Sequence, residues 1–228
     1  MEVKPFPLMT CKTNLIDMYF KKPNHTSFAD LGGVWGVEAG YTFYTLQKYK
    51  ITKGYLFDED IHACVKTEAN QYSQLELHEM DFRSPKAVEK IPHVDAIFLF
   101  YILLHQVNPN WDELLKMYAP KTDAFLIVAP QWDGEKTIRL FDLGKDEYFK
   151  QVPHEPTYGK HYPKLFGPQH HEVENVSNIW QWGITDKDLI DVMHQMDFHL
   201  TFYAQHEQWG KSRFMDTSFI FERRKPEN

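Results

Sequence analysis

The chain has 228 residues, of which 43% are hydrophobic, and its 25 Lys and Arg against 32 Asp and Glu give a net charge of −7. This composition excludes a disordered tail, a collagen-like rod and a strongly cationic nucleic-acid-binding protein. Cys11 and Cys64 are too few for a disulfide framework, and no run of about 18 apolar residues could span a membrane. We therefore expect a cytoplasmic protein.

Strand and helix patterns alternate between residues 27 and 130. Nearly continuous apolar runs, such as 95–101, are typical of parallel strands covered on both faces. This alternation predicts an α/β protein with a Rossmann-like doubly wound sheet. The expected strands are 27–31, 54–57, 75–80, 95–101 and 124–129, the last closed by Pro130, and the expected helices are 37–48, 61–71 capped by Asp60, 85–90, and 110–118 capped by Asn110.

The pattern changes over residues 131–183, which are rich in proline, histidine and tryptophan. An insertion of this length in a compact domain is typical of a lid or binding loop. We therefore expect an aromatic lid within a single domain that spans residues 1–228. The N-terminal segment is a second candidate part of the lid.

Regular patterns return after the insertion. Thr185 is expected to cap a helix that continues through Met196. Strands are expected at 199–203 and 217–222, and the connection 204–216 is short for a crossover helix. These two strands are therefore predicted to form an antiparallel pair at the edge of the sheet.

In an open parallel sheet, ligands bind beyond the carboxyl ends of the strands. Glycines there let the backbone approach a ligand closely, a carboxylate can accept both hydroxyls of a ribose, and an acidic residue beside an apolar one can bracket a base. This combination indicates a nucleoside-binding site. The residues concerned are Gly32, Gly33 and Gly36 after the first strand, Asp58 after the second, and Asp81 with Phe82 after the third.

Two common nucleotide-binding patterns are absent from the glycine cluster. The dinucleotide fingerprint needs glycines at i, i+2 and i+5, whereas positions 32, 34 and 37 are Gly, Val and Val. The phosphate-binding loop needs Gly-Lys-Ser/Thr, whereas Val37 and Glu38 follow Gly36. A dinucleotide or a nucleoside triphosphate is therefore disfavoured.

The segment Asp-Leu-Gly-Gly-Val-Trp-Gly at 30–36 resembles the first motif of the class I S-adenosylmethionine-dependent methyltransferases. The resemblance extends over residues 27–223, and 95–105 is similar to the family's fourth strand and the segment that follows it. Where the first motif usually has a middle glycine, this chain has Val34. The family's terminal strand pair also matches the edge pair expected here.

The resemblance implies an enzyme that uses S-adenosylmethionine as its cofactor. Asp58 matches the family's ribose-binding acid, and Asp81 with Phe82 matches its adenine-contacting pair. The strings 98–107 and 178–185 are similar to a bacterial subgroup of methyltransferases without an assigned substrate. The cofactor-binding residues implied in this way are Asp30, Gly32, Gly33, Gly36, Asp58, Asp81, Phe82, Phe100 and Tyr101.

We expect methyl transfer to a small-molecule acceptor, on an oxygen atom. The negative net charge and the lack of Lys and Arg clusters argue against a nucleic-acid substrate. A hydroxyl acceptor must lose a proton, and His105, just beyond the fourth strand, is the candidate general base. The candidate acceptor-binding residues, all in the insertion, are Trp132, His154, His170, His171, Trp180 and Trp182.

Structural roles compete with several of these assignments. The glycine cluster could be only a tight turn, Asp58 could cap the next helix, and Asp81 could stabilise a turn. His105 could be a hydrogen-bonded core residue, and the aromatic insertion could be a plug that stabilises the sheet. No metal site is expected, because the adjacent side chains of His170, His171 and Glu172 point apart.

Two other functions stay open at this level. A non-catalytic protein could keep the nucleoside site without turnover, which Val34 and the lack of an unambiguous base would favour. An oxidoreductase with an atypical dinucleotide loop is disfavoured, because the fingerprint is missing.

Overall fold

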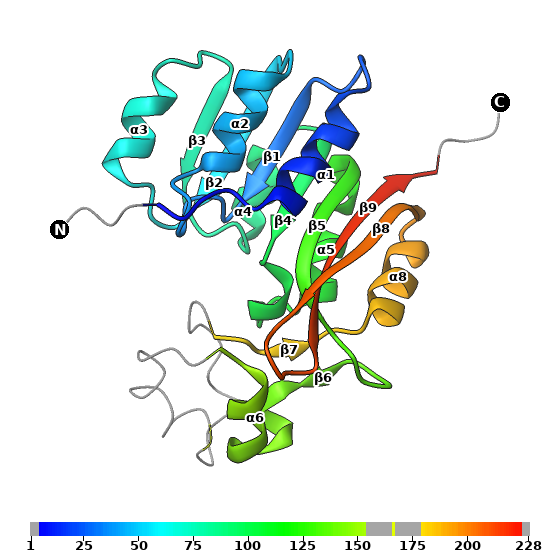
Figure 1. Ribbon diagram of the computed structural model, residues 1–228. Helices are drawn as coiled ribbons and strands as arrows, with labels where there is room; N and C mark the ends of the chain where they lie inside the picture. Colours follow the sequence, from blue (N-terminus) through cyan, green and yellow to red (C-terminus); the bar gives the residue numbers. More distant parts are fainter. Residues whose placement is uncertain (1–4, 154–165, 167–178, 225–228) are drawn as a thin grey trace.

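The computed structural model describes residues 5–153, 166 and 179–224. Its main sheet has the strand order β3-β2-β1-β4-β5-β9-β8, in which β1 to β5 pair in parallel and β9 runs antiparallel to both β5 and β8 (Figure 1). This is the predicted doubly wound α/β sheet with an antiparallel terminal pair. Its strands are β1 (Ser27–Leu31), β2 (Lys53–Asp58), β3 (Leu75–Glu79), β4 (Val94–Phe100), β5 (Thr122–Trp132), β8 (Phe198–Gln208) and β9 (Phe214–Arg223).

Helices cover both faces of this sheet. Among the described residues, no helix is long and apolar enough to cross a membrane. The helices are α1 (Thr10–Phe20), α2 (Gly40–Lys48), α3 (Ala63–Ala69), α4 (Pro85–Lys90), α5 (Trp111–Tyr118), α6 (Lys145–Gln151) and α8 (Asp186–Gln195), with 3₁₀ turns at Leu103–His105 (η1), Ala119–Lys121 (η2) and Leu140–Leu143 (η3).

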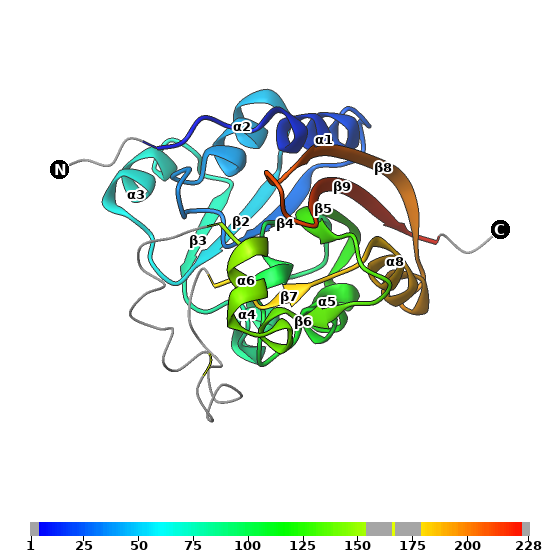
Figure 2. The same cartoon turned by 60° about the horizontal axis from the view of Figure 1, so that its bottom comes forward.

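Two apolar clusters hold these helices against the sheet. Successive strand residues point to opposite faces, so Phe98 packs under α1, α2 and α3 while its neighbour Ile97 packs over α4, α5 and α8. Figure 2 shows the two helical layers on either side of the sheet. Because both faces are covered, the central strands are apolar along most of their length, which explains the continuous runs in the sequence.

Several predicted boundaries were wrong. Strands β8 and β9 extend beyond the predicted 199–203 and 217–222, and three other boundaries differ for a local reason. Helix α2 begins at Gly40 rather than 37, because Glu38 and Ala39 have φ values of 50° and 59°, outside the helical region. Helix α3 begins at Ala63 with His62 as its N-cap, so Asp60 does not cap it. Asn110 does cap α5, in a capping box with Glu113.

The third boundary is the end of β5, which continues through Pro130 to Trp132. Val128 turns its carbonyl toward β4, where it accepts a hydrogen bond from the Tyr101 amide at 2.7 Å. Pro130, two residues later, faces the same side of β5 but lies beyond Phe100, the last β4 residue that pairs with β5. The missing N–H of Pro130 therefore removes no hydrogen bond between these two strands. Pro130 meanwhile pairs with Asp216 on β9.

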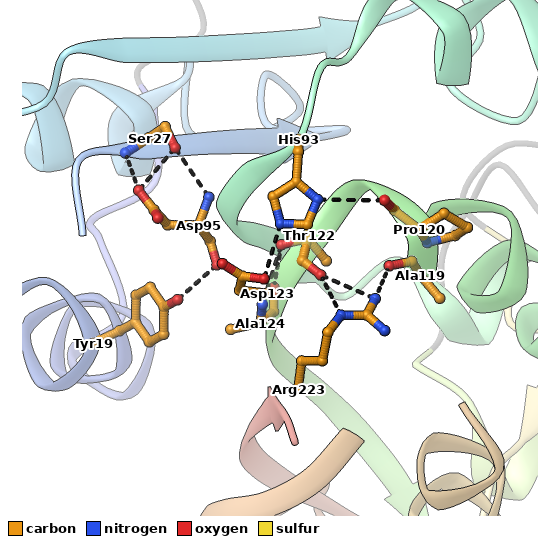
Figure 3. Close-up of polar contacts among 10 residues, drawn as sticks. All are labelled: Tyr19, Ser27, His93, Asp95, Ala119, Pro120, Thr122, Asp123, Ala124 and Arg223. Atoms are coloured by element: carbon orange, nitrogen blue, oxygen red, sulfur yellow. Dashed lines mark hydrogen bonds and ion pairs between the residues drawn. The ribbon is translucent and has the colours of Figure 1, made fainter. Parts of the chain in front are cut away.

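Polar contacts join the elements at the amino ends of the strands (Figure 3). One carboxylate oxygen of Asp95, at the start of β4, accepts bonds from the Thr26 and Ser27 amides and the Ser27 hydroxyl at 2.7, 2.8 and 2.8 Å. The Tyr19 hydroxyl of α1 donates to the Asp95 carbonyl at 2.6 Å. The Arg223 guanidinium of β9 donates to carbonyls beside the start of β5. This end of the sheet is therefore tied together by its own residues.

The described part of the 131–183 segment lies beyond the carboxyl ends of the parallel strands (Figure 1). Strands β6 (Ile138–Arg139) and β7 (Trp182–Gly183) pair antiparallel there. A third apolar cluster joins this segment to η1 and to the start of β9. Its buried members are Leu104, Trp132, Leu140, Phe141, Tyr148, Val152, Ile179, Trp180 and Phe214.

Candidate functional site

The glycine loop after β1 is built around the carboxylate of Asp30. This side chain is 2% exposed, and its Oδ2 accepts a hydrogen bond from the Thr42 hydroxyl at 2.7 Å. A Cβ at position 33 would lie 2.5 Å from Asp30 Oδ2, so only glycine fits above the carboxylate. Burial raises the pKa of Asp30 to about 6. The buried carboxylate and Gly33 together set the path of the loop.

The ends of β1, β3 and β4 meet at Gly32. This residue has φ +74°, and a Cβ on it would lie 2.6 Å from the Ile102 side chain and 3.4 Å from the Phe82 ring. The Gly32 amide donates to the Phe57 carbonyl of β2 at 2.7 Å. The structure therefore brings together the glycine loop and Phe82, as the sequence predicts.

Asp58 joins the end of β2 to the same loop. Its Oδ2 accepts a hydrogen bond from the Val34 amide at 3.0 Å, and its Oδ1 accepts one from the Asp60 amide at 3.3 Å. Burial raises the pKa of this carboxyl, while the backbone donors act in the opposite direction. No Lys or Arg of the described residues lies within ion-pair distance of it. Its remaining lone pairs are available to hydroxyl donors, and it does not cap α3.

Asp81 and Phe82 have different surroundings. One Asp81 oxygen accepts bonds from both the amide and the Nε of Arg83, each at 2.8 Å. The Phe82 carbonyl accepts a bond from the Tyr118 hydroxyl of α5 at 2.5 Å, which fixes the backbone at this point. Asp81 thus stabilises its own turn, the structural role that competes with base contact, while the Phe82 ring borders Gly32.

The end of β4 carries an aromatic box that contains a lysine from α1. Lys12 is 5% exposed, and its Nζ lies 3.8 Å from the Tyr101 ring centroid, 5.2 Å from that of Tyr41 and 5.7 Å from that of Phe100. Burial lowers the pKa of Lys12 to about 8. Among the residues that the structure describes, no carboxylate lies within ion-pair distance of this ammonium. The box therefore stabilises a cation through its ring faces.

Tyr101 connects this box to β9. Its backbone has φ 61°, and its hydroxyl donates to Asp216 Oδ2 at 2.6 Å. The Trp209 indole donates to the other oxygen of Asp216 at 2.8 Å. Burial and the Asp216 carboxylate raise the pKa of the Tyr101 hydroxyl, so it remains a proton donor. Lys12, Tyr41, Trp209 and Asp216 are absent from the residues that sequence reasoning selects.

His105 lies in η1, where the end of β4 meets the insertion. Its Nδ1–H donates to the Ile179 carbonyl at 2.8 Å, which leaves the lone pair of the neutral imidazole on Nε2. Burial lowers the pKa of His105 to about 4. The Gln181 amide donates to the neighbouring Leu104 carbonyl at 2.9 Å. His105 is therefore neutral near pH 7 and hydrogen-bonded to the insertion.

The tryptophans expected to bind the acceptor pack mainly against other side chains. Trp132 and Trp180 are each 6% exposed in the third apolar cluster, and both rings contact Phe214, with centroids 5.1 and 5.0 Å away. The Trp182 indole donates to the Gln106 carbonyl at 2.7 Å. These contacts match the plug alternative for this part of the insertion. The predicted residues His154, His170 and His171 lie outside the described residues.

Gln131, beside Trp132, is a polar residue that sequence reasoning missed. It is 3% exposed, and neither its side-chain oxygen nor its nitrogen has a hydrogen-bond partner among the described residues. Buried amide groups are almost always hydrogen-bonded in native proteins. The Gln131 side chain is therefore suited to form hydrogen bonds with a polar ligand or a water molecule at the carboxyl end of β5.

The strand order and the residues at the strand ends identify the class of fold. The chain has the Rossmann-like fold of the class I S-adenosylmethionine-dependent methyltransferases. Its glycine loop, Asp58 and Phe82 lie at the carboxyl ends of β1, β2 and β3. No protein-family model matches the sequence, and no curated protein matches it significantly.

Three solved structures illustrate the similarity. The N-terminal domain of EvdMO1, crystallised in the presence of SAH and D-fucose, has a TM-score of 0.62 and 12% identity over 96% of this chain and 85% of its own. The 1,6-didemethyltoxoflavin-N1-methyltransferase of Burkholderia thailandensis has a TM-score of 0.62 and 8% identity, over 95% and 79%. A putative S-adenosylmethionine-dependent methyltransferase of Listeria monocytogenes has a TM-score of 0.58 and 11% identity, over 94% and 99%.

Proposed function

We propose that this protein transfers a methyl group from S-adenosylmethionine to an oxygen atom of a small-molecule acceptor. The observation that carries the proposal is the convergence of three strand ends on one loop. Asp58 reaches the Val34 amide, while Phe82 and Ile102 border Gly32. The solved structures with this fold include proteins described as methyltransferases, one with bound 1,6-didemethyltoxoflavin and S-adenosylhomocysteine.

The residues of the site fit a nucleoside with an amino-acid tail. Asp58 has no counter-cation among the residues that the structure describes, and its carboxylate is assigned to the ribose hydroxyls. Phe82 offers an apolar face for the adenine, and Gly32 and Gly33 let a ligand approach the backbone. Lys12, whose ammonium lacks a carboxylate partner among the described residues, is assigned to the ligand carboxylate.

S-adenosylmethionine supplies a methyl group on a positively charged sulfur, which an oxygen nucleophile can attack in line. The ring faces of Tyr41, Phe100 and Tyr101 hold the Lys12 ammonium, which we assign to the carboxylate of the same ligand. His105 is the group we assign to the acceptor proton, because its neutral imidazole holds a lone pair on Nε2 at pH 7. Positioning of the two reactants supplies the remainder of the acceleration.

The acceptor is assigned to the space framed by η1, the end of β5 and the insertion. Gln131 offers unsatisfied polar atoms there, and His154, His170, His171 and Trp182 remain candidates from the sequence. A net charge of −7 disfavours a nucleic acid. EvdMO1 was crystallised with D-fucose, which supports a hydroxylated small molecule as the first class to test.

Mass spectrometry with a deuterium-labelled methyl donor tests the proposal. The protein is incubated with labelled S-adenosylmethionine and separate panels of monosaccharides, phenols and heteroaromatic amines, and the products are searched for the labelled methyl group. We expect a labelled ether with the wild type and a much lower yield with Asp58→Ala. A labelled amine alone would overturn the oxygen assignment. Tight cofactor binding without any product would instead support the non-catalytic alternative.

A further inference from the structure

A mixed cluster of possible metal ligands lies beside the glycine loop. Glu38, two residues beyond Gly36, faces His62 and Cys64 at the start of α3. His62 Nδ1 lies 2.9 and 2.8 Å from the two Glu38 oxygens, and Cys64 Sγ lies 3.1 Å from Glu38 Oε2. One ligand atom from each residue lies within 4.8 Å of the other two. Sequence spacing does not reveal this cluster, because Glu38 and His62 are 24 positions apart.

The donor set is the one that zinc prefers. A thiolate, an imidazole nitrogen and a carboxylate oxygen are its usual protein ligands, whereas magnesium and calcium prefer oxygen alone. Zinc bonds of about 2.0 to 2.3 Å in a tetrahedron place neighbouring ligand atoms roughly 3.3 to 3.6 Å apart. The Glu38 carboxylate needs to separate from His62 Nδ1 and Cys64 Sγ by only about half an ångström to reach these distances. Cys64 and His62 are exposed, so a metal ion can enter and water can supply a fourth ligand.

The surroundings of the cluster also favour a metal-bound histidine. His62 Nε2 lies 3.7 Å from Asp60 Oδ2, on the side of the ring away from Glu38. Zinc-bound histidines usually donate their second N–H to such a carboxylate, which orients the ring. Glu38 is held in place by its backbone, since its amide donates to the Val34 carbonyl at 2.8 Å.

We propose that Glu38, His62 and Cys64 form a zinc-binding site that joins the glycine loop to the β2–α3 connection. On binding, the Cys64 thiol gives its proton to solvent and the thiolate coordinates the metal. Thiolate and carboxylate together neutralise the charge of Zn²⁺. This site does not depend on the proposed methyl transfer, and it lies in the loop beyond Asp58, so the metal would also restrict the segment that carries the ribose-binding carboxylate.

Cobalt spectroscopy on the metal-free full-length protein tests the site. Co²⁺ reports a bound thiolate through a near-ultraviolet charge-transfer band, and Zn²⁺ displaces it. We expect one equivalent of Co²⁺ with this band in the wild type and in Cys11→Ser, and no band in Cys64→Ser. The two cysteines are matched, because Cys11 lies in α1 outside the cluster.

Competition with a zinc-chelating dye measures affinity independently of the band. His62→Ala and Glu38→Gln should each weaken Zn²⁺ binding at least tenfold, and Asp60→Ala should weaken it about 10- to 100-fold through the ring orientation. Circular dichroism verifies that each variant folds, and the exposed positions of His62 and Cys64 make this outcome expected. Zinc affinity that is unchanged in both Cys64→Ser and His62→Ala would overturn the proposal, as would the absence of stoichiometric binding by the wild type.

Discussion

Asp95 and Asp58 lie at opposite ends of the parallel strands, and the hydrogen-bond donors around each carboxylate determine its role. Asp95 at the amino end receives three donors on one oxygen, from Thr26 and Ser27, and ties β4 to β1 (Figure 3). Asp58 at the carboxyl end accepts hydrogen bonds from backbone amides, that of Val34 on one oxygen and that of Asp60 on the other. A carboxylate of the second kind can accept ligand hydroxyls without losing its structural bonds.

Replacing Asp58 with Ala should therefore weaken S-adenosylhomocysteine binding by about 1.5 to 3 kcal/mol, or roughly 10- to 150-fold. Isothermal titration calorimetry measures the loss. Asp95→Ala is the matched control, and it should lower the free energy of unfolding while leaving the affinity of the folded protein unchanged. Equal affinities of wild type and Asp58→Ala would remove Asp58 from the site.

Lys12 links ligand binding to pH. Its pKa is about 8 in the folded protein against an ordinary value of 10.5, so the unfolded chain binds more protons between these two values. Stability should therefore rise with pH across this window, by an amount on the order of 3 kcal/mol. Below pH 8 both states are protonated, and the folded state bears the full cost of burying the charge.

Lys12→Met should remove this rise and stabilise the protein at pH 7, as urea denaturation at several pH values would show. The same change should weaken S-adenosylhomocysteine binding at pH 7 by about tenfold, because a charged partner of the carboxylate is lost. In the wild type the affinity should fall above pH 8, whereas the variant should show no such fall. A destabilised Lys12→Met with unchanged affinity would contradict the role assigned to this lysine.

His105 gives a pH signature of the same sign as that of Lys12, in a more acidic window. Burial lowers its pKa from 6.5 to about 4, so the stability it contributes is complete above pH 6.5 and is lost as the pH falls through 4. His105→Gln should flatten this acid loss and lower turnover by about 10²- to 10⁴-fold, with cofactor affinity nearly intact. Turnover equal to that of the wild type would exclude His105 as the base and leave the core-histidine role.

At the scale of elements, apolar runs predict the parallel strands because burial on both faces leaves few positions for polar residues. Helix α1 is not predicted by the pattern of apolar residues. Its buried positions 12, 15, 16, 19 and 20 have helical spacing, but the first of them is a lysine and not an apolar residue. The N-cap residue Met9 makes no side-chain hydrogen bond to the helix. The polarity of Lys12, which brings α1 into the proposed site, also obscures the helix in the sequence.

The sequence likewise predicts some residues of the candidate site and not others. Gly32, Gly33, Asp58 and Phe82 follow their strands directly, so strand order alone brings them together. Lys12 meets Tyr101, and Glu38 meets His62, only through tertiary packing, which no local pattern reports. Sequence reasoning therefore identifies the strand-end residues and misses the groups that other elements deliver.

Trp132 separates the two roles proposed for the insertion. Its side chain is 6% exposed and packs against Phe214, so Trp132→Ala should lower the free energy of unfolding by about 3 to 5 kcal/mol in urea denaturation. Trp35→Ala is the control, because Trp35 is 65% exposed and its loss should have little effect on stability. A small stability loss accompanied by a large rise in the acceptor KM would instead support the acceptor-binding role.

In the whole molecule, the two ends of the main sheet carry different groups of residues. The amino end is fastened by Asp95, Tyr19 and Arg223, and the carboxyl end carries the glycine loop, Asp58 and the box around Lys12. The described part of the insertion packs beyond the carboxyl end (Figures 1 and 2). This division is expected for an open α/β sheet, in which ligands bind where the parallel strands finish.

Calorimetric titration of the wild-type protein with S-adenosylhomocysteine and, separately, with NAD distinguishes a methyltransferase site from a dinucleotide site. The missing dinucleotide fingerprint, the Asp58 carboxylate and the Lys12 ammonium, which has no carboxylate partner among the described residues, all favour the first ligand. We predict saturable binding of one equivalent of S-adenosylhomocysteine and no heat of binding with NAD. Binding of NAD without binding of S-adenosylhomocysteine would exclude the proposed cofactor and favour an oxidoreductase.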